Sequence, residues 1–199
     1  MRTFYYLLIC LLLLTFWGCG ANASKDYFLR EQVDIAYIKR IAVLPFENNT
    51  KDNFVAPRAR DLATTQILSQ RIFDVVDKGQ VDSALREEAI KPGTPLDDLT
   101  IKRLGQRLNV QAILLGSVDH AGEQHKGASS FAELSLTMRL IDSKTAILLW
   151  QTSGSGSGYS VVDRLFGLNP KDAFEVTMTL IDDLLSSIPR TKAGSTATQ

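Results

Sequence analysis

The sequence predicts an α/β fold: a mixed central sheet with an antiparallel C-terminal hairpin, flanked by helices. Two short segments, residues 41–44 and 110–118, place apolar residues on both faces of a strand. Such runs are typical of strands that are buried on both faces. Residues 131–141 instead alternate apolar and polar side chains, which indicates a strand with one solvent-exposed face. Segments with helical spacing of apolar residues lie between and after these strands, as an α/β sandwich requires.

The first half of the expected domain contains two strands and three helices. Pro45 ends the first strand because it has no backbone N–H to donate. The first helix is expected to bury Leu62, Ala63, Ile67 and Leu68. The expected elements are a strand at residues 39–46, a polar turn at 47–53, a helix at 57–70, a strand at 73–76, and helices at 80–89 and 94–108.

The second half is expected to contain three strands and a closing helix. The elements are a strand at residues 110–118, a polar loop at 120–130, a strand at 131–141, a hairpin turn at 142–145, its partner strand at 146–151, an irregular segment at 159–169 and a helix at 172–188. Apolar residues of the last helix recur at helical spacing, which predicts a buried stripe made of Phe174, Met178, Ile181, Leu185 and Ile188.

Composition excludes several classes of function for the folded part. The formal net charge is zero, so the total shows no basic surface for nucleic acid. Both cysteines, Cys10 and Cys19, lie within the first twenty residues. We therefore expect neither a disulfide framework nor a cysteine-based zinc site beyond them.

The N-terminus has the pattern of a secretion signal. Arg2 precedes an apolar run at residues 4–14, which has the length of a signal-peptide core. The run ends in Phe16-Trp17-Gly18-Cys19, which resembles the lipobox of bacterial lipoproteins, where the cysteine is lipidated and becomes the mature N-terminus. Gly20, in place of an aspartate, implies the outer membrane and its periplasmic face. A membrane anchor, or a secreted protein cut elsewhere, is the alternative.

These observations divide the chain into four parts. Residues 1–18 are predicted to be the signal peptide, and residues 19–32 the lipidated cysteine and a tether. Part of the segment 21–38 is too apolar for a free linker and is expected to dock on the domain. Residues 33–189 form the periplasmic α/β domain, and residues 190–199 a disordered tail.

No constellation of residues predicts catalysis, a metal or a cofactor. Asp119, His120, Glu123 and His125 are metal-ligand types, but a solvated loop explains them better. Gly154, Gly156 and Gly158 suggest a phosphate cradle, yet Tyr159 stands where the pattern requires its third glycine, so a strand end is the better interpretation. The G-x-S-x-G pattern of serine hydrolases does not occur. The sequence therefore predicts that the protein is not an enzyme and binds no cofactor.

Four stretches carry a resemblance to a known group: IAVLPF (41–46), FDVVDKGQVDSAL (73–85), RLGQRLNVQAILLGSV (103–118) and MRLIDSKTAILLW (138–150). Together they resemble periplasmic lipoprotein domains related to CsgG, the curli secretion channel, to LpoB, the activator of a penicillin-binding protein, and to the N-terminal domain of TolB. The resemblance implies an architecture like that of the anticodon-binding domain.

The same resemblance implies two functions. The first is an outer-membrane lipoprotein whose periplasmic domain binds a protein, as an envelope-assembly accessory or an activator of peptidoglycan synthesis; its partner would be a penicillin-binding protein. The alternative is a CsgG-like secretion accessory that forms an oligomeric ring without its own membrane barrel. Residues 120–130 are too few and too polar, and residues 151–169 lack the alternation, for membrane-spanning hairpins.

A partner surface is expected at the end of the sheet away from the hairpin turn. The loop at 120–130 and the segment at 154–169 both lie at that end if residues 131–141 and 146–151 pair in antiparallel fashion. Exposed aromatic residues favour interfaces. We therefore expect Tyr159, Arg164, Leu165 and Phe166 to contact a protein partner; the alternative is that Phe166 covers the core.

Overall fold

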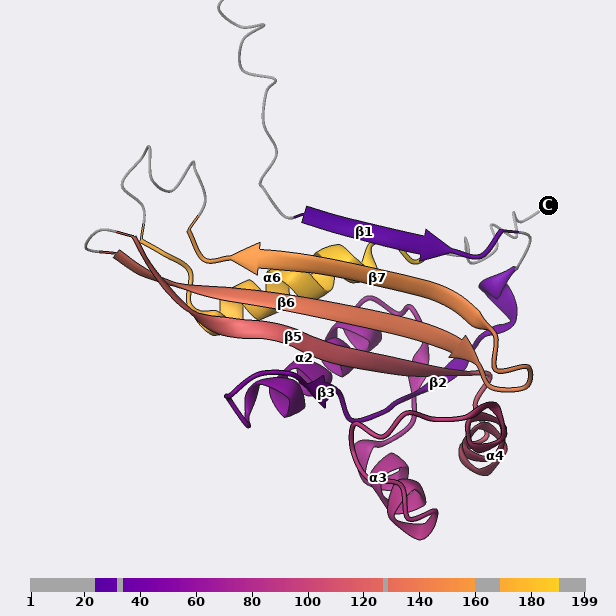
Figure 1. The fold of residues 1–199 in the computed structure, drawn as a ribbon. Helices are drawn as coiled ribbons and strands as arrows, with labels where there is room; N and C mark the ends of the chain where they lie inside the picture. Colours follow the sequence, from indigo (N-terminus) through magenta and orange to yellow (C-terminus); the bar gives the residue numbers. More distant parts are fainter. Residues whose placement is uncertain (1–23, 32–33, 127–128, 160–168, 190–199) are drawn as a thin grey trace, which may run out of the picture.

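The computed structural model describes residues 24–31, 34–126, 129–159 and 169–189 (Figure 1). These residues form one seven-stranded sheet with helices on both faces. The elements are β1 (Ser24–Leu29), η1 (Ile35–Tyr37), β2 (Arg40–Val43), β3 (Glu47–Asn48), α2 (Val55–Ser69), β4 (Asp74–Val75), α3 (Lys78–Glu87), α4 (Asp98–Leu108), β5 (Ala112–Lys126), β6 (Ser129–Asp142), β7 (Leu148–Ser157) and α6 (Ala173–Leu185).

The sheet is mixed, as the sequence predicts. Its order is β1-β7-β6-β5-β2-β4, and the short β3 also pairs with β5. Strand β2 runs parallel to both β4 and β5. The other half of the sheet, β5-β6-β7-β1, is antiparallel throughout and contains the predicted C-terminal hairpin. The α/β fold class is thereby confirmed.

The two central strands are buried on both faces. Alternate residues of β2 point into different cores: Ile41 and Val43 belong to one cluster, Ala42 and Leu44 to the other. Helices α2 and α6 cover the first cluster, and α3 and α4 cover the second, as their separate positions around the sheet show (Figure 1). The apolar runs that predicted these strands therefore reflect burial on two sides.

Beyond the central strands, one face of the antiparallel half stays polar. The inward residues of β6, Leu134, Leu136, Met138 and Leu140, are buried, as the alternation predicts. On the opposite face, the Thr137 hydroxyl donates to Asp119 (2.7 Å) and lies 2.9 Å from the Ser153 hydroxyl. These polar side chains on three neighbouring strands form hydrogen bonds with one another on a face open to water.

Two segments differ from the sequence-based expectation. Residues 120–126 and 129–130, expected as parts of a polar loop, belong to the paired arms of β5 and β6. Their composition suggested a loop, but the long β6 continues the pairing past an irregularity between Val118 and His120. Ser24–Leu29, expected within the tether, is strand β1 at the edge of the sheet, paired with β7. The expectation that part of this segment docks on the domain is confirmed.

The expected helices are present, but in α2 and α6 the buried face includes different residues from those predicted. In α2, Ala59, Ala63 and Ile67 are buried while Leu68 is half-exposed, so the prediction for Leu68 was wrong. In α6 the buried face runs through Val176, Leu180 and Leu184, with Ile181 beside them. Phe174 lies on another face of the helix and is exposed, and Met178 is only partly buried, so the predictions for these two residues were wrong. No helix within the described ranges is long and apolar enough to cross a membrane.

Asp142 holds the turn between β6 and β7. Its Oδ1 accepts hydrogen bonds from the backbone N–H groups of Lys144 and Thr145, and its Oδ2 accepts one from the Tyr37 hydroxyl at 2.5 Å. Burial by itself raises the pKa of Asp142, but these hydrogen bonds outweigh it, so the pKa lies below its usual range. Burial first, and then the bond to Asp142, raise the pKa of Tyr37.

The pH dependence of stability tests this contact. Removing the hydroxyl with Tyr37→Phe should lower the free energy of unfolding by about 1–2 kcal/mol at pH 7. Because the folded-state pKa of Asp142 is depressed, its contribution is complete above the unfolded carboxyl pKa of about 4 and is lost as pH falls through the folded value. Urea denaturation at a series of pH values should show the difference between the two proteins shrinking below about pH 4. A difference that stays constant down to pH 2 contradicts the assignment.

Candidate functional site

A hollow lies at the end of the sheet where the predicted partner surface was expected. The arms of β5 and β6 run beyond the end of β7 and reach the first turns of α2 and α6 (Figure 1). They enclose a hollow of about 460 Å³ that is open to solvent. Its apolar lining includes Val55, Phe131, Leu134, Ala173 and Val176.

Acidic side chains outnumber basic ones around this hollow. Four carboxylates and two bases line it: Asp52, Glu123, Glu133 and Asp172, against Arg58 and Lys171. Asp172 and Asp52 also accept hydrogen bonds from the backbone N–H groups of Glu175 and Phe54, both at 2.8 Å, so each shapes the start of a helix. The surface therefore combines an apolar floor with an acidic border.

Four aromatic rings lie in or next to the hollow, two of them partly buried and two exposed. Phe131 packs against Tyr159 with the ring centroids 5.6 Å apart and the planes tilted by 32°. Phe54, which lies between the lining residues Asp52 and Val55, is 74% exposed. Phe174, next to Ala173, is 53% exposed. Large apolar side chains left in water around a concave surface are typical of binding sites.

Gly158 ties three elements together at the edge of the hollow. Its N–H donates to the Ala132 carbonyl and its carbonyl accepts from the Lys171 N–H, both at 2.7 Å. A Cβ atom at position 158 would lie 2.4 Å from the Lys171 carbonyl oxygen. Only glycine permits this close approach.

The residues singled out from the sequence are distributed unevenly. Tyr159 lies at the hollow, whereas Cys19, Arg164, Leu165 and Phe166 lie outside the described residues. Gly154 and Gly156 lie within β7, which agrees with a strand end rather than a phosphate cradle.

Three of the four residues of metal-ligand type, Asp119, His120 and Glu123, take separate partners, and the fourth, His125, is exposed on the β5 arm. Asp119 accepts from Ser117 and Thr137, His120 lies 3.7 Å from Glu133, and Glu123 accepts from Ser130. Within the described part of the chain, no group of three His, Cys, Asp or Glu residues is placed to hold a metal ion.

A second hollow was not expected from the sequence. It measures about 480 Å³ and lies between α2 and α3, at the carboxyl ends of the parallel strands β2 and β4. Crevices at this position bind ligands in many open α/β sheets. This rule, applied to the predicted order of strands and helices, could have predicted the second hollow from the sequence. Its apolar lining is made of Pro45, Phe46, Pro57, Leu85, Ile90 and Pro92.

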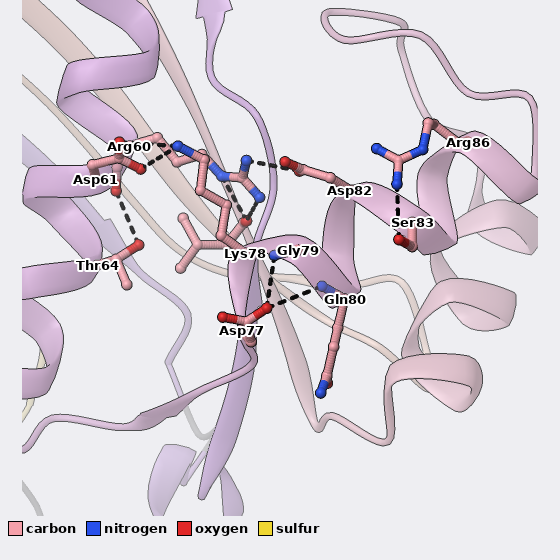
Figure 2. A network of polar contacts seen from close by, with 11 residues as sticks. Arg60, Asp61, Thr64, Asp77, Lys78, Gly79, Gln80, Asp82, Ser83 and Arg86 are labelled. Atoms are coloured by element: carbon pink, nitrogen blue, oxygen red, sulfur yellow. Dashed lines mark hydrogen bonds and ion pairs between the residues drawn. The ribbon is translucent and has the colours of Figure 1, made fainter.

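Ion pairs occupy most of the charged groups at this second hollow (Figure 2). The buried Arg60 donates to the Val43 carbonyl from Nε (3.1 Å) and Nη2 (2.8 Å), and its Nη1 lies 2.8 Å from Asp82. Lys78 pairs with Asp61 at 2.6 Å. Asp77 accepts from the N–H of Gly79 and so caps the start of α3. Arg60 therefore links α2, β2 and α3, and the network is satisfied without a ligand.

The described residues form a small α/β domain built on one mixed sheet, with a hollow at one end of that sheet. A family model described as "Putative lipoprotein GNA1162-like" matches residues 34–187, and the chain belongs to this family. The resemblance to periplasmic lipoprotein domains that the sequence indicated is thereby confirmed. Among curated protein sequences, none matches this chain.

Two solved structures, PelC and GNA1162, share the fold at low sequence identity. PelC from Paraburkholderia phytofirmans, solved as a dodecamer, aligns with a TM-score of 0.58 and 18% identity over 83% of this chain and 96% of that one. Lipoprotein GNA1162 from Neisseria meningitidis aligns with a TM-score of 0.55 and 19% identity over 75% and 97%. The LpoB C-terminal domain from Escherichia coli gives a TM-score of 0.46 and 16% identity over 62% and 86%.

A pair of glycine variants tests the close backbone contact at the edge of the hollow. Gly158→Ala should destabilise the protein by about 1–3 kcal/mol, because the added methyl group meets a backbone carbonyl. Gly156→Ala is the matched control: its Cβ would make only ordinary contacts with Val176 and Leu180. Urea denaturation of both variants checks this, and equal stability of the two contradicts the role given to Gly158.

A second pair tests the link between α2, β2 and α3. Arg60→Ala leaves the buried Val43 carbonyl without its donor and should cost about 2–4 kcal/mol of stability. Lys78→Ala removes only an exposed ion pair and should change stability by less than about 0.5 kcal/mol. Similar midpoints of thermal unfolding for both variants would contradict the structural role of Arg60.

Proposed function

We propose that this protein is an outer-membrane lipoprotein, anchored through Cys19, whose periplasmic domain docks another envelope protein at the hollow between the β5–β6 arms and the starts of α2 and α6. In this proposal it acts as an envelope-assembly accessory or as an activator of peptidoglycan synthesis, carries out no reaction of its own and needs no cofactor. The observation that carries the proposal is the exposure of Phe54 and Phe174 beside an acidic hollow.

The chemistry of the hollow describes the partner it fits. Exposed aromatic side chains gain free energy when a partner covers them, and such residues contribute strongly to protein interfaces. The excess of carboxylates favours a partner segment with Lys or Arg next to apolar residues. Tyr159 extends the aromatic surface through its contact with Phe131.

The rest of the predicted partner surface belongs to the same proposal. Arg164, Leu165 and Phe166 fall between Tyr159 and the lining residue Lys171 in the sequence, so they are proposed to contribute to the same contact. A penicillin-binding protein is the first partner to test, because the sequence resembles that of its activator.

A secretion accessory that forms an oligomeric ring is the second candidate. The observation in its favour is that PelC, which has a similar fold, was solved as a dodecamer. The two candidates differ in self-association. Size-exclusion chromatography of the full acylated chain in detergent distinguishes them, since a monomer or dimer favours the first and a large ring favours the second.

Partner capture with matched variants tests the docking surface. Phe54→Ala together with Phe174→Ala should lower the yield of the captured envelope protein at least about tenfold, because the contact loses two aromatic anchors. Leu99→Ala is the control, since Leu99 on α4 is similarly exposed (67%) but far along the chain from the hollow. Capture uses the acylated chain and envelope extract treated with fluorescent penicillin, so that penicillin-binding proteins are identified directly.

The outcomes of this capture are distinct. An unchanged yield in the double Phe variant, with unchanged thermal unfolding, contradicts docking at the hollow. Loss of capture in the Leu99→Ala control places the contact on the other helical layer. A captured protein without fluorescence excludes the penicillin-binding class and favours a secretion component.

A further inference from the structure

Strand β1 is a fixed part of the domain. All six residues of the strand pair with β7, from Ser24 opposite Ser155 to Leu29 opposite Trp150. Lys25 adds contacts to α6, where its Nζ lies 2.7 Å from the Asp183 carboxylate and 3.0 Å from the Ser186 hydroxyl. The position of Ser24 relative to the sheet is therefore set by the fold.

The chain between the proposed lipid anchor and this strand is short. Four residues, 20–23, separate Cys19 from Ser24. A fully extended chain spans at most about 3.3–3.6 Å per residue, so the Cα of Ser24 lies within about 18 Å of the lipidated residue. This step rests on the proposed acylation of Cys19. If it holds, the edge of the sheet formed by β1 is kept next to the bilayer.

The β5–β6 arms decide how the sheet is oriented. Ser24 is level with Ser155, which pairs with Ser135, and β6 begins six residues nearer the tip at Ser129. At about 3.3 Å per residue the arms extend roughly 20 Å past Ser24 on the side of the tip. If the strands stood upright with this tip toward the membrane, the tip would enter the headgroup layer. That placement is unfavourable because Glu123, Gln124 and His125 near the tip are polar and exposed to water. Strands lying along the surface avoid this.

The free edge of β1 carries two exposed aromatic residues. Tyr27 is 62% exposed and Phe28 is 46% exposed. As neighbours in a strand they project to opposite faces, so the rings flank the edge of β1 that pairs with no other described strand. Aromatic residues favour the boundary between water and lipid, where one side of the ring is apolar and the other is wet.

We propose that the β1 edge lies on the lipid headgroup surface, with Tyr27 and Phe28 at the interface and the strands along the membrane plane. In this orientation the hollow at the end of the sheet opens sideways rather than toward the bilayer. A partner then approaches it along the membrane. Lipid contacts the β1 edge of the sheet, whereas a partner docks at the end of the sheet, so the two contacts do not compete.

Site-specific quenching tests this orientation. The mature chain has no cysteine other than Cys19, so one engineered cysteine carries one label. Fluorophores are placed at Asp26→Cys on β1, Gln124→Cys on the β5 arm and Leu99→Cys on α4. The acylated protein is reconstituted in vesicles of phosphatidylethanolamine and phosphatidylglycerol that contain headgroup-nitroxide lipid. Quenching should be several-fold stronger at residue 26 than at residues 99 and 124.

A lengthened tether separates the aromatic contact from simple proximity. Inserting about ten Gly/Ser residues after Asn22 releases the constraint on distance. Quenching at residue 26 should then stay above that at residue 99, and should fall to the same level when Tyr27→Ser and Phe28→Ser are added. Loss of quenching while both aromatic residues are still present overturns the interface assignment.

Other outcomes also overturn the proposal. Strongest quenching at residue 124 means that the arms face the membrane. Dipolar coupling between spin labels at residue 26 of two copies, without lipid quenching, means that the edge pairs with a second chain. The intact mass shows whether Cys19 is acylated. An unmodified Cys19 removes the lipid-anchored function as well, whereas an acylated, partner-binding protein without quenching at residue 26 removes this inference alone.

Discussion

Burial of β2 and β5 on both faces is the constraint on which the rest of the structure depends. A strand that is apolar on both sides needs a cover on both sides, so helices must pack above and below it. Two separate cores result, one under α2 and α6 and one under α3 and α4. Arg60 joins the layers where they meet, because its buried guanidinium reaches the Val43 carbonyl at the end of β2.

The antiparallel half of the sheet needs cover on only one face, and this difference creates the candidate site. Strands β5 and β6 continue beyond β7 after the core has ended, so their arms enclose space that side chains do not fill. The first turns of α2 and α6 reach the same place and leave Phe54 and Phe174 in water. In a member of a lipoprotein family, a concave surface of this kind suits a docking role.

The β1 edge of the sheet and the crevice at the ends of its parallel strands differ in what they can bind. At one edge, β1 combines a short connection to the predicted anchor with exposed aromatic side chains. At the other, the parallel strands end in a crevice whose charges are satisfied by ion pairs within the domain. An edge strand with unpaired backbone groups invites association, and its position next to the lipid would shield it from unwanted pairing.

Local patterns were enough to predict the fold class, because two-sided apolar runs, strict alternation and helical spacing follow directly from which side chains are buried. The sequence also indicated the lipoprotein class and the end of the sheet where Tyr159 lies. The pairing of polar segments depends on tertiary contacts: residues 120–126 of β5 are strand because the start of β6 pairs with them, and β1 joins the sheet because it pairs with β7. The exposure of Phe174 likewise depends on which face of α6 packs on the sheet: Val176, Leu180 and Leu184 face the core, and Phe174 does not.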